Sequence, residues 1–335
     1  MATIINADNG SVSGSAGLKQ SSDASGILQL QTNGTAAVTV NAAQAVAFAN
    51  AISAPNTFGF KNRIINGDMR IDQRNAGASV TPANNDYGID RFKFQLTQTA
   101  KITTQQNAGS VTPPAGFTNY LGVTSTSAYS VVDADQFLVS QYIEGYNVAD
   151  LGFGTADAKT ITVSAWVRSS LTGTFSGVIQ NSAANRNYPF VYTISTANTW
   201  TFISATIAGD TSGTWLTTNG RGLRLIFSFG NGSTYASSAG AWTSQEFVTA
   251  ATGTTNVVGT NGATFYLTGV QLEKGSTATS FDVRPYATEF FLCQRYFEKN
   301  FPTDVAPQNG YSGGGMSGGG NGWVSFSTTS IRGPM

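Results

Sequence analysis

The chain has 335 residues with 18 Lys or Arg, 18 Asp or Glu, no histidine and one cysteine, so its formal net charge is zero. These counts exclude a Ser–His–Asp triad, a histidine-bearing metal site and a disulfide framework, and the balanced charge argues against binding to nucleic acid. The apolar runs are far shorter than a membrane span, so we expect no membrane insertion. A surface of hydroxyls and amides with only 11% charged residues fits a component of an extracellular particle.

Residues 1–60 hold few charges and few large apolar side chains. Two runs of alternating polarity, 27–31 and 36–40, flank Asn33-Gly34, which is the strongest short signal for a β-hairpin. The sequence therefore predicts a two-stranded hairpin near the start of the chain.

Residues 42–52 are small and apolar, and Phe48 and Ile52 stand at helical spacing. So few large side chains cannot build a core in a single copy. We therefore expect residues 1–60 to be ordered by association with copies of themselves or with another protein. A flexible leader is the alternative interpretation.

From residue 61 to residue 286, period-two alternation recurs between turn residues. The clearest runs are 161–168, 200–207, 223–229 and 265–272. In the last run the apolar positions change parity at Gly269, which indicates a β-bulge. Strands at this spacing, with no helical pattern between them, predict an antiparallel β-sandwich, and a jelly roll is the commonest version at this length.

Residues 288–299 carry the one convincing helical pattern. Thr288 is placed to cap the helix, and Glu289 complements its N-terminal dipole. Phe290, Cys293 and Phe297 line one stripe, so we expect Cys293 to be a packed thiol and not a nucleophile.

Residues 302–335 comprise a Gly-rich loop, an alternating run at 323–327 and the beginning of a further β element. We expect the chain to be truncated there or completed by strands from a neighbouring copy. The predicted organisation is an attachment and oligomerisation segment at 1–60, a jelly-roll sandwich at 61–286, a connecting helix at 287–301 and the Gly-rich loop with the start of a further β element at 302–335.

Two stretches carry a family resemblance. Residues 62–75, which include Asn66-Gly67-Asp68, resemble the opening of a domain that recurs in tail-fibre and minor structural proteins of tailed bacteriophages, and 269–286 followed by 293–299 resembles its end. Shorter matches lie at 141–145 and 162–168, and residues 14–35 resemble the leader before such domains. The resemblance implies a jelly roll similar to carbohydrate-binding modules in a virion protein, and it brings no catalytic residues.

Sugar binding by a β-sandwich uses aromatic rings that stack on pyranose faces, together with amides that bond the hydroxyls. The candidate glycan-binding residues are Trp166, Tyr188, Tyr192, Trp215, Tyr235 and Trp242. Trp215 and Trp242 lie in Thr/Ser/Gly-rich segments, where a core tryptophan is less expected, whereas Trp166 is more simply a core or edge residue. The amide-rich loops 181–187 and 217–221 are candidates for polar contacts.

Calcium is the metal to consider, because oxygen ligands alone are plentiful in this chain. Asn66-Gly67-Asp68 resembles the start of jelly-roll modules that carry a structural calcium. Asp282 approaches Asp68 if the first and last strands of the domain meet. We therefore predict a structural calcium at Asp68 and Asp282 as a hypothesis, with no other cofactor.

Glycan cleavage needs two carboxylates at a defined separation. Asp133 and Asp135 share a face of an extended segment, and Glu144 and Glu246 lie elsewhere. No long β-helix repeat of the kind found in depolymerase tailspikes is present in the sequence. We therefore expect a protein that is not an enzyme and keep a glycan depolymerase as the less favoured alternative.

These observations predict a phage virion structural protein, a homotrimeric tail-fibre subunit. It would attach to another virion protein through residues 1–60 and bind host-surface polysaccharide through the jelly roll, where several weak sites act together. The alternative is a head-decorating or collar/adaptor protein without a receptor role.

Overall fold

The computed structural model describes residues 27–32, 35–43, 46–48, 60–299, 302 and 305–307. The chain divides into two compact units, Met1–Pro55 and Asn56–Met335. The expected Gly-rich loop and the strand at 323–327 lie outside the described residues. In the described part of the chain, no helix has the length and apolar character needed to span a membrane.

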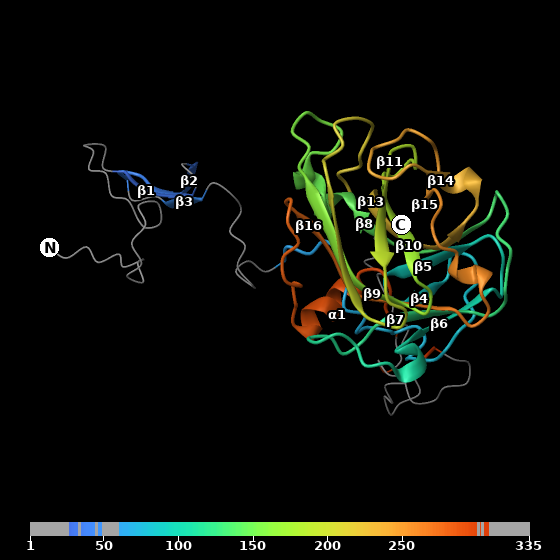
Figure 1. Ribbon diagram of the computed structural model, residues 1–335. Coiled ribbons are helices and arrows are strands. Elements are labelled where there is room, and N and C mark those ends of the chain that lie inside the picture. The colour runs from blue at the N-terminus through green and yellow to red at the C-terminus, as the bar shows by residue number, and fades with distance from the viewer. Residues whose placement is uncertain are drawn as a thin grey trace, which may run out of the picture. The chain divides into compact units, whose positions relative to one another are not determined.

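The first unit contains a three-stranded antiparallel sheet in the order β1-β2-β3 (Figure 1). Its strands are β1 (Leu28–Thr32), β2 (Thr35–Val40) and β3 (Val46–Phe48). The predicted hairpin is confirmed, because β1 pairs with β2 and Thr32 lies opposite Thr35. The helix suggested by the spacing at 42–52 is wrong for residues 46–48, which form a strand. This strand pairs with β2 and forms hydrogen bonds with backbone groups at the edge of β2 that would otherwise lack partners.

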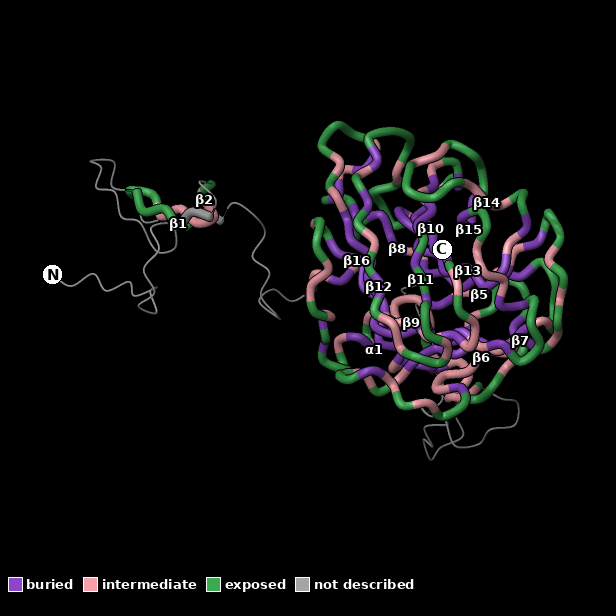
Figure 2. The backbone as a smooth tube through the Cα atoms, viewed as in Figure 1, coloured by how far each residue is buried: buried purple, intermediate pink, exposed green. Residues whose placement is uncertain are grey.

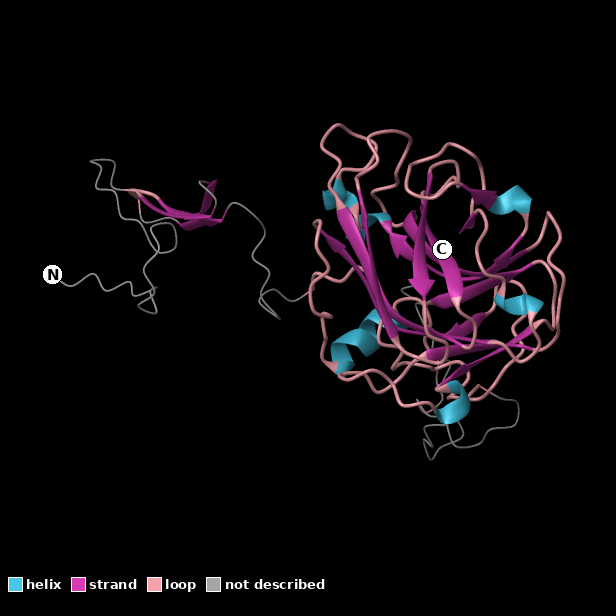
Figure 3. Cartoon of the chain, in the orientation of Figure 1, coloured by secondary structure: helices cyan, strands magenta, loops and turns pink. Residues whose placement is uncertain are grey.

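Over its described residues the second unit is an antiparallel β-sandwich with one α-helix, as predicted (Figure 3). Its six-stranded sheet runs β11 (Asn187–Ile194), β10 (Gly173–Gln180), β13 (Arg221–Asn231), β8 (Gln136–Glu144), β5 (Phe92–Leu96) and β4 (Tyr87–Ile89). Its five-stranded sheet runs β12 (Thr201–Ile207), β9 (Ile161–Ser169), β16 (Thr264–Lys274), β7 (Leu121–Ser125) and β6 (Ile102–Gln106).

The remaining elements are short. A parallel pair of strands is formed by β14 (Ala236–Ser237) and β15 (Ala250–Ala251). The 3-10 turns are η1 (Ala108–Ser110), η2 (Gly145–Asn147), η3 (Ala149–Leu151), η4 (Ser233–Tyr235) and η5 (Val257–Gly259), and the helix is α1 (Tyr286–Gln294).

The strand order is that of a jelly roll. Four neighbouring strands of the five-stranded sheet have the order β7-β16-β9-β12, and four of the six-stranded sheet have the order β8-β13-β10-β11. Strands of the two sheets alternate along much of the sequence, so the chain crosses repeatedly from one sheet to the other. The β10–β11 hairpin stays within one sheet, while β4, β5 and β6 extend the edges. The predicted fold class is therefore confirmed.

The core lies between the two sheets because each strand alternates apolar and polar positions (Figure 2). In β5 the residues Phe92, Phe94 and Leu96 are all at most 2% exposed, whereas the residues between them are half-buried. The rings of Phe229 and Phe265 lie 5.5 Å apart and join the two sheets. Each such fully buried side chain stabilises the fold by about 1.5–3 kcal/mol.

The predicted bulge in β16 is confirmed. The pairing of β16 with β9 shifts register between Thr268 and Gln271, and Gly269 has φ 61°. A methyl group added at Gly269 would lie 2.7 Å from Phe117 Cζ, so glycine is required by the backbone conformation and by the packing. The bulge keeps both halves of the strand directed at the core.

Helix α1 begins earlier and ends earlier than the sequence predicts. Pro285 is the N-cap residue and the N–H of Glu289 donates to its carbonyl (3.1 Å), so Thr288 is already inside the helix and does not cap it. The α-helix ends at Gln294 and the chain turns at Arg295 and Tyr296. The expected packing of Cys293 is confirmed, since it is 1% exposed, and burial raises the pKa of its thiol.

Candidate functional site

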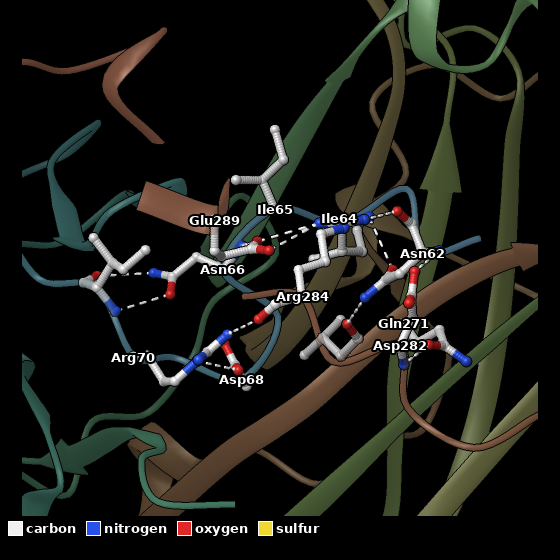
Figure 4. Close-up of polar contacts among 12 residues, drawn as sticks. Asn62, Ile64, Ile65, Asn66, Asp68, Arg70, Gln271, Asp282, Arg284 and Glu289 are labelled. Carbon is white, nitrogen blue, oxygen red and sulfur yellow. Dashed lines mark hydrogen bonds and ion pairs between the residues drawn. The ribbon is translucent and has the colours of Figure 1, made fainter. Parts of the chain in front are cut away.

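The two ends of the sandwich unit are tied together by a buried polar network (Figure 4). The Asn66 side chain donates to the carbonyls of Ile71 (2.8 Å) and Asp90 (3.0 Å) and accepts from the Ile71 N–H (2.9 Å). The Asn62 side chain donates to the carbonyl of Val270 in the last strand (3.0 Å). These amides satisfy buried backbone groups around Ile71, which lies outside the sheets, and join the segment at 62–71 to β16.

An ion pair stands at the centre of the network. Arg284 Nη1 lies 3.2 and 3.1 Å from the two carboxylate oxygens of Glu289, and these side chains are 6% and 5% exposed. Arg284 also donates to the carbonyls of Asn62 and Ile64, and Glu289 accepts from the Asn66 N–H. The motif residues at 62–75 and 269–286 therefore hold the ends of the domain together.

The two carboxylates of the calcium hypothesis belong to this network and are engaged separately. Asp68 pairs with Arg70, and burial raises the pKa of Asp68 despite that partner. Asp282 accepts from the Asn62 N–H (3.2 Å). Figure 4 shows the two on either side of the Arg284 side chain. Among the residues that the structure describes, no cluster of three His, Cys, Asp or Glu side chains is placed to hold a metal, and calcium at Asp68 and Asp282 stays a prediction.

The carboxylates considered for glycan cleavage have structural contacts. Asp135 is 2% exposed and accepts from the Thr97 hydroxyl (2.8 Å). Burial alone would raise the pKa of Asp135, but hydrogen bonds, that of the Val132 N–H first, outweigh it and lower the pKa. Glu144 pairs with Arg295 at 2.9 Å. The other two candidates, Asp133 and Glu246, are exposed.

Three of the predicted glycan-binding residues come together at one edge of the sandwich. Trp215 and Trp242 pack edge to face on Phe153 and on each other, with 4.8 Å between the Phe153 and Trp215 centroids and 5.5 Å between the two indoles, and Tyr188 packs edge to face on Trp242. The Trp242 indole donates to the Ala208 carbonyl (2.8 Å), just beyond β12. These half-buried rings cover the core next to the edge strands β11 and β12, and their role in binding sugar stays a prediction.

Tyr192 is a core residue, so its assignment to a sugar site is wrong. It is 7% exposed and its ring stacks on Phe175 (6.0 Å, 12°), because alternation in β11 directs it inward. Burial raises the pKa of its hydroxyl. Trp166 is half-buried on the outer face of the five-stranded sheet, 5.4 Å from the ring of Phe202, and its binding role stays a prediction.

A groove of about 290 Å³ lies over the outer face of the six-stranded sheet. Its floor is formed by the outward-facing side chains of β5, β8, β10 and β13, which alternate along each strand with side chains that point into the core. One wall is the segment after β13, where β15 contacts β10, β11 and β13. The lining includes Gln95, Gln180, Arg221, Arg224, Tyr235 and Phe247. Amides, guanidinium groups and aromatic rings thus converge at one site.

Arg224 is the buried charge of this groove. It is 4% exposed, and its guanidinium donates to Ser140 Oγ (3.0 Å), Gln180 Oε1 (3.3 Å) and Gln95 Oε1. Its Nε has no hydrogen-bond partner among the described residues. Burial lowers the pKa of Arg224 to about 10, so the group is still a cation at neutral pH.

Two aromatic residues stand at the rim of the groove. Phe247 is 55% exposed and has φ 57°, and its N–H donates to the carbonyl of Ala184 (2.8 Å), which is itself at φ 57°. Tyr235, a predicted glycan-binding residue, is half-buried in η4. A left-handed conformation costs a non-glycine residue about 1–2 kcal/mol. The backbone therefore holds an exposed ring at this rim at some cost to stability.

Most of these groove residues were not among the predicted site residues. Arg221 and Ala184 lie in the amide-rich loops singled out in the sequence, and Tyr235 was named, but Arg224 and Phe247 were missed. A signal for Arg224 was present, since it has the opposite parity from Leu223 and Leu225 and so faces away from the core.

Neither a scan of protein-family models nor a search of curated proteins gives a match. Similar solved structures include a putative sugar binding protein from Bacteroides thetaiotaomicron, with TM-score 0.36, 10% identity and coverage of 64% of this chain and 99% of that chain. Another is the enzymatically active domain of tailspike protein 4 of bacteriophage CBA120, with TM-score 0.34 and 11% identity over 58% of this chain. The chain covers 21% of that tailspike chain.

A third similar structure is a family 11 carbohydrate-binding module from Clostridium thermocellum in complex with a mixed-linked tetrasaccharide. It has TM-score 0.31 and 13% identity, and the match covers 59% of this chain and 96% of that chain. Likenesses this distant carry no argument about what the present chain binds.

Proposed function

We propose that the sandwich unit binds saccharide in the groove over β8, β10 and β13. The observation that carries this proposal is that the exposed ring of Phe247 stands at the rim of a groove whose floor includes the amides of Gln95 and Gln180. Aromatic faces stack on the apolar faces of sugar rings, and amides both donate to and accept from hydroxyls. None of the residues described as lining the groove is Asp or Glu, so we propose binding without cleavage.

The test compares two exposed phenylalanines, one at the rim of the groove and one on the outer face of the five-stranded sheet. We expect Phe247→Ala to weaken binding of host-surface polysaccharide roughly threefold to tenfold, because a well-placed ring contact is worth about 0.5–1.5 kcal/mol. Phe202→Ala, on the outer face of the other sheet, is the matched control and should leave binding unchanged. Absence of binding by the unaltered chain, or equal loss in both variants, would overturn the proposal. Release of reducing ends would reverse the assignment as a binder.

We also propose that the chain is a structural protein of a phage virion, a tail-fibre subunit attached through residues 1–60. The resemblance of residues 62–75 and 269–286 to phage fibre domains supports this proposal. Antibody labelling of intact particles tests it by electron microscopy. Label at the tail is expected, whereas label over the head would favour the decorating or collar role.

Self-association of the first unit, as a homotrimer, completes this proposal. Leu28 lies opposite Val40 and Leu30 opposite Val38, so apolar positions share one face of the three-stranded sheet. Leu28 and Leu30 are 54% and 40% exposed. We expect Leu30→Asp to convert a trimer to monomers in sedimentation equilibrium, and Gln29→Glu on the opposite face to leave the trimer intact. A monomeric unaltered chain would contradict the proposal.

A further inference from the structure

Three cations surround a single ring on the outer face of the six-stranded sheet. The Arg221 and Arg224 guanidinium carbons lie 4.9 and 5.1 Å from the centroid of Tyr142, and Lys93 Nζ lies 5.6 Å from it. Arg224 belongs to the floor of the groove and Arg221 to its lining. Positive charge therefore gathers at the end of the groove that Arg221 and Arg224 line, which we call its positive end.

These cations differ from three other arginines of the domain in what they bond. Arg284, Arg186 and Arg295 each pair with a carboxylate at 3.1, 2.7 and 2.9 Å. None of the ion pairs formed by the described residues includes Arg221 or Arg224.

Neutral oxygens are the acceptors instead. Arg224 donates to two glutamine side chains and a serine, and Arg221 donates to the carbonyl of Ser182. A charge taken out of water without a counter-charge is costly, and neutral dipoles offset that cost only in part. The groove thus holds positive charge that the described fold does not neutralise.

Resting on the proposed function, we infer that the groove selects acidic saccharides, with a carboxylate of the sugar placed against Arg221 and above Arg224. A planar carboxylate matches the fork of guanidinium donors and forms shorter, stronger hydrogen bonds than a hydroxyl does. Phe247 at the rim then stacks on a sugar ring while the carboxylate reaches the positive end. The ligand class is a polysaccharide that carries uronic acids or similar carboxylate-bearing sugars.

Matched pairs of ligands isolate the carboxylate. Tetrasaccharides of galacturonic, glucuronic and mannuronic acid, and the same tetrasaccharides after carboxyl reduction, are titrated into the full chain by calorimetry. We expect at least one acid form to bind tenfold or more tightly than its neutral twin in 50 mM salt. This advantage should shrink in 500 mM salt, because ions screen the charges.

Variants assign the preference to the groove. Arg221→Gln is expected to reduce the ratio of the affinity for the acid tetrasaccharide to that for its neutral twin to about one. Arg168→Gln is the matched control, since Arg168 lies 5.3 Å from the Tyr266 ring on the outer face of the other sheet, and it should keep the ratio. Arg224→Met should also lose the ratio; because Arg224 donates to Gln95 and Gln180 in the floor of the groove, its urea midpoint is measured alongside to show that the variant is folded, and a retained ratio in the folded variant would contradict the assignment of Arg224 to the ligand.

Failure of the inference is distinguishable from failure of the proposed function. If neutral and acid forms bind equally and Phe247→Ala weakens both, the groove binds sugar without selecting charge, and the inference alone is overturned. If no tetrasaccharide binds while host polysaccharide still binds in a Phe247-dependent way, the inference again fails alone. If host polysaccharide does not bind either, the proposed function fails.

Discussion

Replacement of Glu289 by alanine tests the account of the network that closes the domain. Glu289 accepts two charge-assisted bonds from Arg284 and one bond from the Asn66 N–H, and the Arg284 and Glu289 side chains are 6% and 5% exposed. The variant would leave a guanidinium buried without its carboxylate and a backbone N–H without its acceptor. Removal of one partner from a buried pair costs about 3–5 kcal/mol.

The assay is urea unfolding of the full chain, followed by tryptophan fluorescence, with Asp150→Ala as control. Asp150 pairs with Arg63 at 2.8 Å, but its side chain is 46% exposed, so its removal should cost about 0–1 kcal/mol. We therefore expect the Glu289→Ala midpoint to fall far below that of the control. Equal midpoints for the two variants would refute the reasoning that this network holds the ends of the domain together.

Two further predictions concern the same end of the fold. Burial raises the pKa of Asp90 to about 6, so the folded state holds this proton more tightly than the unfolded chain does. The unfolding free energy of the unaltered protein, relative to Asp90→Asn, should therefore fall by about 2 kcal/mol as pH rises from 4 to 7, and a flat difference in urea titrations would contradict this. A methyl group at Gly67 would overlap the carbonyl oxygen of Val270, so Gly67→Ala should cost roughly 1–3 kcal/mol in thermal unfolding. Gly259→Ala, whose methyl would lie 3.8 Å from its nearest neighbour, should cost much less, and similar losses would count against the overlap.

Local signals accounted for much of the fold. An Asn-Gly pair between alternating runs predicts a hairpin, and a parity change around a glycine indicates a bulge, so the β1–β2 pairing and the bulge in β16 both follow from a few neighbouring residues. The boundaries of α1 were missed because a proline in the preceding segment, Pro285, provides the N-cap in place of the favoured Thr288. Such boundaries depend on the surrounding chain more than on the helical period.

The groove depends on the order of strands, which local patterns do not contain. Gln95, Gln180 and Arg224 come from three strands that are far apart in the sequence, and they meet because β13 lies between β10 and β8, with β5 next to β8. Parity with the apolar neighbours places each of these side chains on the outer face of its strand, but no pattern in the sequence indicates that the three share a site. Phe247 was missed because its exposure comes from a single left-handed residue in a loop.

Composition around the tryptophans was a weaker guide. Trp215 and Trp242 lie in segments of small polar residues, which indicated exposure, yet each packs one edge against Phe153 and bonds its indole to a backbone carbonyl. Loops of small residues pass closely over the edge of a sandwich, and large rings there fill the space beside the edge strands. The composition of these segments therefore does not distinguish a tryptophan that covers the edge of the sandwich from one that binds a sugar.

A crystal structure of the full chain with a bound acidic oligosaccharide tests the central claim most directly. We expect a sugar ring beside Phe247 and a sugar carboxylate within hydrogen-bond distance of Arg221, over the outer face of β13 and β8. Density for the sugar on Trp166 and Phe202, or on Trp215 and Trp242, with the groove empty, would contradict the claim.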